Sequence, residues 1–188
     1  MRRELGWLLL SSGLFGCAPL ASLRPAGGLW ESDRSAEIGA GAVALGPRPY
    51  VIESWQPVGQ VWGTLGLDRS FELSAIGAFD EQAFAAGGAL RWIPLRADRL
   101  AAGAEVEFGF AWAALALPIA LRLSDGLWLY TAPRLGNMGI HLTPGLPGGL
   151  SLEIFDGWIV RAEAQLSWEE FLAYQRRVHL AGGMAYQW

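Results

Sequence analysis

Apolar and polar residues alternate with a period of two through most of the chain after residue 34, and this pattern constrains the fold more than any other feature. The final eleven residues, Val178 to Trp188, show it clearly. One parity carries Leu180, Gly182, Met184, Tyr186 and Trp188, and the other carries His179 and Gln187. Successive side chains of a strand point to opposite faces of the sheet, whereas an amphipathic helix repeats every 3.6 residues. The pattern therefore predicts strands with one apolar face.

Segments of strand length with this alternation recur along the chain. They are 35 to 45, 58 to 67, 71 to 79, 83 to 93, 100 to 111, 115 to 123, 127 to 135, 148 to 154, 158 to 167 and 178 to 188. Short turn-forming stretches lie at 68 to 70, 94 to 99, 124 to 126 and 155 to 157, and longer connections lie at 46 to 57, 136 to 147 and 168 to 177. We expect an all-β fold, a closed up-and-down antiparallel transmembrane β-barrel of ten strands, with eight as the alternative because 35 to 45 and 148 to 154 alternate weakly.

Sorting the residues by parity gives two faces. One face is free of charge and includes Ile38, Val61, Leu73, Leu90, Val106, Leu121, Leu152, Val160 and Leu180. The other face carries charged residues separated by glycine and alanine. The twelve that we expect to form a charge network in the lumen are Glu37, Glu72, Arg91, Glu105, Glu107, Arg122, Arg134, Glu153, Arg161, Glu163, Arg177 and His179.

Two classes of barrel fit this alternation. A soluble barrel would solvate the second face and enclose an apolar ligand, and a periplasmic lipoprotein of that kind is the alternative. A membrane barrel would turn the apolar face outward, and three observations favour it. First, small residues lie between the charged residues of the charged face, so that face is not densely polar. Second, mean hydropathy is +0.26, although no run approaches the ~20 apolar residues of a membrane helix. Third, aromatic residues collect near the strand ends, with Phe79, Phe84, Phe110, Trp112 and Trp168 at one rim and Trp92, Trp158, Tyr186 and Trp188 at the other.

The N-terminal residues have the composition of an export signal. Arg2 and Arg3 precede an apolar run from residue 5 to 15, which is too short to span a bilayer as a permanent helix. Residues 14 to 17, Leu-Phe-Gly-Cys, resemble a bacterial lipobox, which implies lipidation of Cys17; a conventional signal peptide is the alternative. We expect residues 1 to 17 to be the signal, 18 to 34 a flexible tether and 35 to 188 the barrel.

The end of the chain resembles the closing strand of small bacterial outer-membrane β-barrels. The residues that carry the resemblance are Tyr186 and the terminal Trp188, in a strand with one apolar face. In that family the terminal aromatic belongs to the assembly signal. The resemblance implies localisation in the bacterial outer membrane, with membrane lipid and the barrel-assembly machinery as partners.

The expected lumen charges are nearly balanced, which favours ion pairs and hydrogen bonds that cross and fill a narrow barrel. We therefore expect a structural or surface-interaction role and not a wide pore. A net charge of −4 with a pI near 5.2 argues against nucleic acid as a partner. Neither a cofactor motif nor a metal cluster is recognisable, since His141 has no second ligand nearby.

Catalysis has little support in the sequence. Outer-membrane lipid A deacylases are similar in size, and resemblance to them would require a serine close in sequence to His179, which is absent. The sequence also lacks a Gly-x-Ser-x-Gly motif. We expect no enzyme, and a lipid-modifying enzyme is the third hypothesis.

Parity also predicts strand register. Residues 68 to 70, 124 to 126 and 155 to 157 must act as three-residue loops, because a two-residue turn would oppose residues of opposite face. Gly126 and Gly157 then take a left-handed backbone conformation. The expected cross-strand partners are Ser151 with Arg161, Glu153 with Ile159, and Arg122 with Trp128. Pro118 and Pro133 each remove a ladder donor, so their two strands should fray or bulge there.

Overall fold

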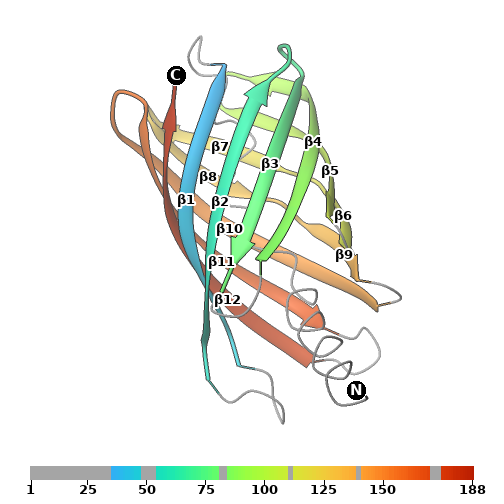
Figure 1. Ribbon diagram of the computed structural model, residues 1–188. Coiled ribbons are helices and arrows are strands. Elements are labelled where there is room, and N and C mark those ends of the chain that lie inside the picture. Colours follow the sequence, from blue (N-terminus) through green and yellow to red (C-terminus); the bar gives the residue numbers. More distant parts are fainter. Residues whose placement is uncertain (1–34, 48–53, 81–83, 110–111, 139–140, 170–174) are drawn as a thin grey trace, which may run out of the picture.

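The computed structural model describes residues 35–47, 54–80, 84–109, 112–138, 141–169 and 175–188 (Figure 1). Cys17, the predicted signal and the predicted tether lie outside these residues. The described chain forms twelve strands: β1 (Ala36–Leu45), β2 (Gln56–Gly66), β3 (Phe71–Phe79), β4 (Phe84–Ala97), β5 (Leu100–Gly109), β6 (Trp112–Ala116), β7 (Ile119–Ser124), β8 (Leu127–Thr131), β9 (Arg134–Met138), β10 (His141–Phe155), β11 (Trp158–Glu169) and β12 (Gln175–Gln187).

All the strands belong to one antiparallel sheet that closes on itself, with β12 paired to β1. Strands β6 and β7 both pair with β5 and are the two halves of one barrel strand, interrupted at residues 117 and 118. Strands β8 and β9 both pair with β10 and are likewise two halves, interrupted at residues 132 and 133. Counting each pair of halves once gives a closed barrel of ten strands, as predicted.

The two rims of the barrel differ in their connections. At the turn rim, residues 67–70, 98–99, 125–126 and 156–157 join the strands, and Ser35 and Trp188 lie there side by side. The opposite rim, which we call the loop rim, carries the connection from β1 to β2 (Figure 1). The predicted loop from 136 to 147 is wrong, because β10 begins at His141 and pairs residue by residue with β9 from Met138 to Arg134. Its prolines and glycines suggested a loop, but the ladder continues through them.

The three predicted cross-strand pairs are confirmed, whereas the predicted loops 124 to 126 and 155 to 157 are each one residue shorter than expected. Ser151 lies opposite Arg161, Glu153 opposite Ile159, and Arg122 opposite Trp128. Gly126 and Gly157 have φ angles of 73° and 79°. Beside each of these turns the register shifts by one residue, so that Phe155 rather than Ile154 lies opposite Trp158.

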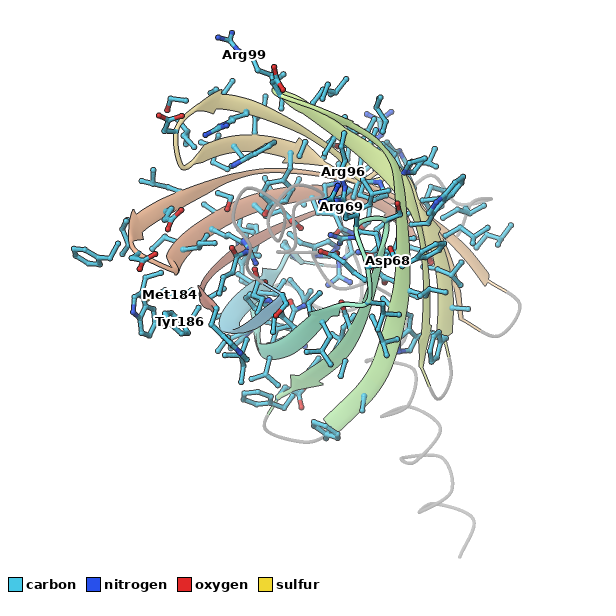
Figure 2. All side chains as sticks on the ribbon, turned by 90° about the horizontal axis from the view of Figure 1, so that it is seen from above. Asp68, Arg69, Arg96, Arg99, Met184 and Tyr186 are labelled. Atoms are coloured by element: carbon cyan, nitrogen blue, oxygen red, sulfur yellow. The ribbon has the colours of Figure 1, made fainter. Side chains whose placement is uncertain are left out.

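The two predicted faces are the outside and the inside of the barrel. Ile38 is 59% exposed, whereas its neighbour Glu37 is 4% exposed. Seen along the barrel, Met184 and Tyr186 lie on the outside of the wall (Figure 2). Trp112 is an exception to the prediction, because it shares its parity with the buried residues of β6 and its indole lies against Gly87 and Gly109 on the inside. The sequence parity changes between β5 and β6, within a connection that alternation alone does not define.

The interior contains apolar side chains as well as charged ones. One cluster joins Ile93, Trp128 and Tyr130 with two alanines, and another joins Trp62, Ile159 and Ala185. The Trp62 ring lies directly over Gly39, so close that it leaves no room for a Cβ there, and it also lies near Gly183. The glycines at these positions of the inner face give room to an aromatic ring.

The turn at Gly157 gives the first testable prediction. Gly157→Ala should lower the free energy of unfolding by about 1–2 kcal/mol, because the residue has a φ of 79° and an added Cβ would lie 2.5 Å from the carbonyl oxygen of Gln187. Gly182→Ala is the matched control: its nearest contact would be 3.8 Å away, and it should be neutral or stabilising. Unfolding of both variants in detergent, followed by tryptophan fluorescence, measures the difference. Equal stabilities would contradict the assigned turn.

Candidate functional site

The inner face carries most of the residues that were predicted to form a charge network. Ten of the twelve are buried: Glu37, Glu72, Arg91, Glu105, Glu107, Arg134, Arg161, Glu163, Arg177 and His179. The other two, Arg122 and Glu153, are half-buried beside the turns. Arg122 contacts the exposed carboxylate of Asp125 at 2.8 Å, and Glu153 accepts a hydrogen bond from the backbone of Gly157.

Glu37 is the centre of the largest described group of polar contacts. The Arg161 guanidinium donates from its two terminal nitrogens to the two carboxylate oxygens, at 2.7 and 2.6 Å. The Trp62 indole N–H and the Gln187 side-chain amide donate to the same carboxylate, at 2.6 and 2.7 Å. These partners come from β11, β2 and β12, while Glu37 belongs to β1. One carboxylate therefore connects four strands on both sides of the β12–β1 seam that closes the barrel.

Local packing explains why Arg161 and Glu37 meet. The Arg161 guanidinium carbon lies 5.9 Å from the centre of the Trp62 ring, which covers the glycines of the neighbouring strands. Small residues at the seam leave space for the long side chain to pass β12 and reach β1. Stacking of arginine on an aromatic face adds a cation–π contribution to the bidentate ion pair.

A second group of charges lies on the wall formed by β3, β4, β5 and β9. Arg91 contacts Glu105 at 2.7 Å and Glu72 at 3.2 Å, and Arg134 pairs with Glu107. Each pair joins adjacent strands or strands separated by one neighbour. We expected ion pairs across the lumen, and the pairs described here follow the wall instead, which also couples the strands on which they lie.

Near the loop rim, His179 meets a serine that the sequence did not suggest. The Ser167 hydroxyl and the Nε2 atom of His179 are 2.8 Å apart. Ser167 lies on the neighbouring strand, where Gln165 opposes His179, so register and not sequence proximity brings the two together. Beside them, Arg177 donates to the carbonyl oxygen of Gly46. A serine hydrogen-bonded to a histidine resembles a nucleophile with its base, but Ser167 is 0% and His179 is 1% exposed, so neither side chain is open to solvent in this arrangement.

The remaining predicted residues lie apart from these inner groups. Tyr186 and Trp188 are on the outer face at the turn rim, where Tyr186 packs on Trp158 and on Trp188 with ring centres 5.2 and 6.0 Å apart. His141 begins β10. Among the described residues, no group of three or more His, Cys, Asp or Glu side chains could hold a metal ion. No helix in this part of the chain is long and apolar enough to cross a bilayer.

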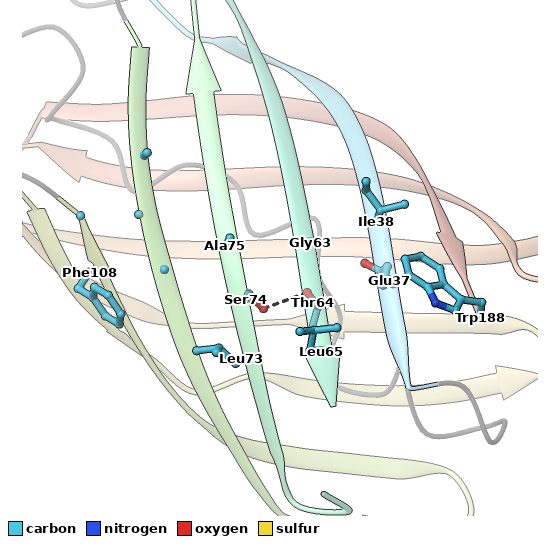
Figure 3. Close-up of a pocket in the computed structure, with 14 residues that line it drawn as sticks. Glu37, Ile38, Gly63, Thr64, Leu65, Leu73, Ser74, Ala75, Phe108 and Trp188 are labelled. Atoms are coloured by element: carbon cyan, nitrogen blue, oxygen red, sulfur yellow. Dashed lines mark hydrogen bonds between the residues drawn. The ribbon is translucent and has the colours of Figure 1, made fainter. Parts of the chain in front are cut away.

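The outer face has two adjoining apolar depressions. One lies over β1 to β5 with a volume of about 670 Å³, and the other lies over β11, β12 and β1 to β4 with a volume of about 690 Å³. Figure 3 shows the first, whose floor includes Gly63 and Ala75 and whose edges include Ile38, Leu73 and Trp188. The Thr64 and Ser74 hydroxyls lie behind this floor, 2.9 Å apart, and bond to each other. The depression itself presents almost no polar surface.

Sequence reasoning missed Trp62 and Ser167 as members of the inner polar groups. Trp62 lies between Val61 and Gly63 and has the parity of the charged face, so alternation places it inside the barrel. Only charged and polar residues of that face were considered as members of the inner group. Ser167 was assigned by position to the end of a strand near a loop. Its contact with His179 depends on the register between β11 and β12, which no tight turn in the sequence sets.

Comparison with known proteins supports the fold. No protein-family model and no curated protein matches the sequence. Among solved structures, the KdgM porin in complex with disordered oligogalacturonate is similar, with a TM-score of 0.50 and 10% identity over 81% of this chain and 99% of that one. Neisserial surface protein A aligns over 81% of this chain and 97% of its own, with a TM-score of 0.40 and 8% identity. At these identities the KdgM likeness concerns the fold alone.

The Glu37 group generates the second prediction. Glu37→Gln should lower the free energy of unfolding by roughly 3–5 kcal/mol, because it leaves the Arg161 guanidinium buried without its counter-charge. Asp125→Asn, which removes the fully exposed partner of Arg122, is the control and should leave the stability nearly unchanged. Denaturant titration in detergent measures both.

A double variant separates the ion pair from simple packing. Adding Arg161→Met to Glu37→Gln should recover part of the loss, since neither charge is then buried alone. A Glu37→Gln protein as stable as the Asp125→Asn control would show that Glu37 does not hold the seam.

Proposed function

We propose that the chain is an integral β-barrel of the bacterial outer membrane, with a lumen filled by side chains and with a structural or surface-interaction role. The observation that carries the proposal is the inverted distribution of side chains. Large apolar residues cover the outside, and Glu37, Arg91, Arg161 and other charged residues are buried inside. An outer surface covered by large apolar side chains is stable in the apolar interior of a bilayer.

The height of the apolar surface fits a bilayer. On β11, Trp158 and Trp168 lie on the outward parity near opposite ends of the strand, and only Val160, Ala162, Ala164 and Leu166 lie between them on that face. Ten residues of strand rise about 33 Å, and a tilt of about 40° reduces this to about 25 Å along the barrel axis. Outer-membrane barrels present an apolar band of about this height, flanked by aromatic residues.

The alternative of a soluble barrel with an apolar ligand is less well supported. Such a barrel requires an apolar cavity inside and a polar surface outside. Here the described interior contains ion pairs, and the surface carries apolar residues such as Leu65, Leu117 and Phe155, each at least 55% exposed. Soluble monomers seldom expose continuous apolar surface beyond a few hundred Å².

A wide channel is also not part of the proposal. The KdgM porin is a porin by name, and its structure was determined with an oligogalacturonate. In this chain, Trp62, Trp128, Tyr130 and the paired arginines are buried inside the wall and occupy the space that a solute would need. Barrels of about this size have interiors just wide enough for side chains.

The lipid-modifying alternative would use Ser167 and His179. We do not propose it, because both side chains are sealed from solvent. Labelling with a fluorophosphonate tests this directly: modification of the native protein that disappears in Ser167→Ala would establish a reactive serine and overturn the assignment as a non-enzyme.

The proposed orientation follows from the termini. Ser35 donates its backbone N–H to the carbonyl oxygen of Trp188, 2.9 Å away at the turn rim. We infer that this rim faces the periplasm, because the exported chain enters from that side and the short turns lie there. A lipid on Cys17, if the lipobox is used, would then reside in the periplasmic leaflet, with residues 18 to 34 joining it to the barrel.

Fractionation with gel migration tests the proposed location. The protein should sediment with outer membranes, require detergent for extraction, and migrate differently in detergent gels before and after boiling. The same chain with Cys17→Ser and a conventional signal peptide is the control, and it should still need detergent. If that variant is soluble and folded without detergent, the periplasmic lipoprotein is the correct assignment.

The terminal aromatic residues give a further prediction. Deleting residues 186 to 188 should abolish outer-membrane assembly, because it removes the Tyr186–Trp188 stack and the backbone bonds between Trp188 and the start of β1. Phe155→Ala, at a turn where the side chain is 70% exposed, should assemble normally. Heat-modifiable migration of membrane fractions measures both, and normal assembly of the truncated chain would contradict the role of this strand.

A further inference from the structure

The barrel wall contains a row of interruptions that crosses several neighbouring strands. Strands β6 and β7 are separated at Pro118, and β8 and β9 at Pro133. Pro147 lies in the next strand, β10, opposite the same gap, because Gly145 pairs with Arg134 and Gly148 with Thr131. On the other side, β4 shifts register between Trp92 and Leu95. These irregularities lie next to one another across the sheet.

We call this row of interruptions the crease, and hydrogen bonds of the backbone ladder are missing along it. The Gly103 N–H donates to the Pro118 carbonyl at 2.9 Å, and the Leu117 N–H donates to the Pro133 carbonyl at 2.9 Å. In an antiparallel ladder such residues normally exchange two bonds, but proline has no N–H to return. Two ladder bonds are therefore lost on adjacent strands. A hydrogen bond of 2.5 Å from the Thr131 hydroxyl to the Pro147 carbonyl gives that oxygen a side-chain donor.

The crease divides the wall into two parts. On the loop-rim side are two five-residue strands, β6 and β9, which pair with each other and are flanked by β5 and β10. On the turn-rim side, β7 and β8 continue the same barrel strands to a tight turn (Figure 1). Strands this short contribute few ladder bonds, and local opening free energies are lowest where such bonds are few.

Contacts inside the wall hold the β6–β9 section in place. Arg134 on β9 pairs with Glu107 on β5, and the Trp112 ring at the start of β6 packs against Gly87 and Gly109. These are side-chain contacts at the edge of the section, while the prolines remove lateral ladder bonds at its lower end.

We propose that β6 and β9 form a hinged section of the wall that opens the loop end of the lumen, with the proline row as the hinge. Hinges are a few element-terminal residues that absorb the change in backbone angles. The ring of proline fixes its φ angle, so at Leu117–Pro118 and Ala132–Pro133 the change falls on the ψ angles and on the neighbouring residues. The rest of the barrel, which includes the Glu37 seam, stays closed during this motion. The proposal rests on the ladder alone, so it stands or falls separately from the membrane location.

Buried alanines that face inward allow a direct test. Ala114 and Ala120 lie on the same barrel strand on opposite sides of Pro118, and Ala78 lies one residue from the loop end of β3, outside the hinged section. Each is changed to cysteine in the full chain in turn, and N-ethylmaleimide modification in detergent is located by mass spectrometry of the peptide. Opening of the section should make Ala114→Cys react about tenfold faster than Ala120→Cys and Ala78→Cys.

The prolines supply the second measurement. Pro118→Ala with Pro133→Ala restores two ladder donors, and it should slow modification of Ala114→Cys severalfold without changing the rate at Ala120→Cys. Equal rates at Ala114→Cys and Ala78→Cys would mean that the loop rim as a whole admits the reagent, and the proposal would be wrong. If the modification rate at Ala114→Cys is unchanged in the proline variants, the prolines do not act as the hinge. If the double variant does not fold, Pro118→Ala alone is compared with the parent in the same way.

Discussion

The contact between Glu37 and Arg161 lies where the sheet closes, and it joins strands on both sides of that seam. A barrel is formed only when its first and last strands pair, and β1 and β12 meet along a seam lined inside by small residues such as Gly41 and Gly183. Such residues pack weakly across the seam. The carboxylate of Glu37 compensates, because it accepts hydrogen bonds from β2, β11 and β12 at once and so joins the two ends of the chain into one polar group.

The same contact requires a dry interior. A buried ion pair is strongly coupled only where water is excluded, and its desolvation is offset only if each lone pair and N–H finds a partner. Trp62 excludes water, donates to Glu37 and lies beneath the Arg161 guanidinium. Glycines make space for its ring. Aromatic and charged residues inside the barrel are thus parts of one packing arrangement, and neither group would be stable there alone.

Alternation predicted what depends on the local chain, namely the two faces, the ten strands and the cross-strand pairs Ser151–Arg161, Glu153–Ile159 and Arg122–Trp128. It could not predict the one-residue shift beside each turn, or contacts between strands whose register no tight turn sets. Ser167 meets His179 through the register of β11 and β12, and Trp112 turns inward because the parity changes before β6. The strand at His141 was missed because Pro144 and Pro147 suggest a loop, although the pairing partners on β9 hold these residues in the ladder.

The barrel distributes stability unevenly around its circumference. At the seam, every described inner charge of β1, β11 and β12 near the turn rim contributes to a group that joins several strands, and the ladder from β11 through β12 and β1 to β2 runs without a register shift. On the opposite wall, prolines interrupt two neighbouring strands at the same level, and the register shifts in a third. The described contacts therefore couple the strands more tightly at the seam than on the opposite wall, where proline removes ladder bonds.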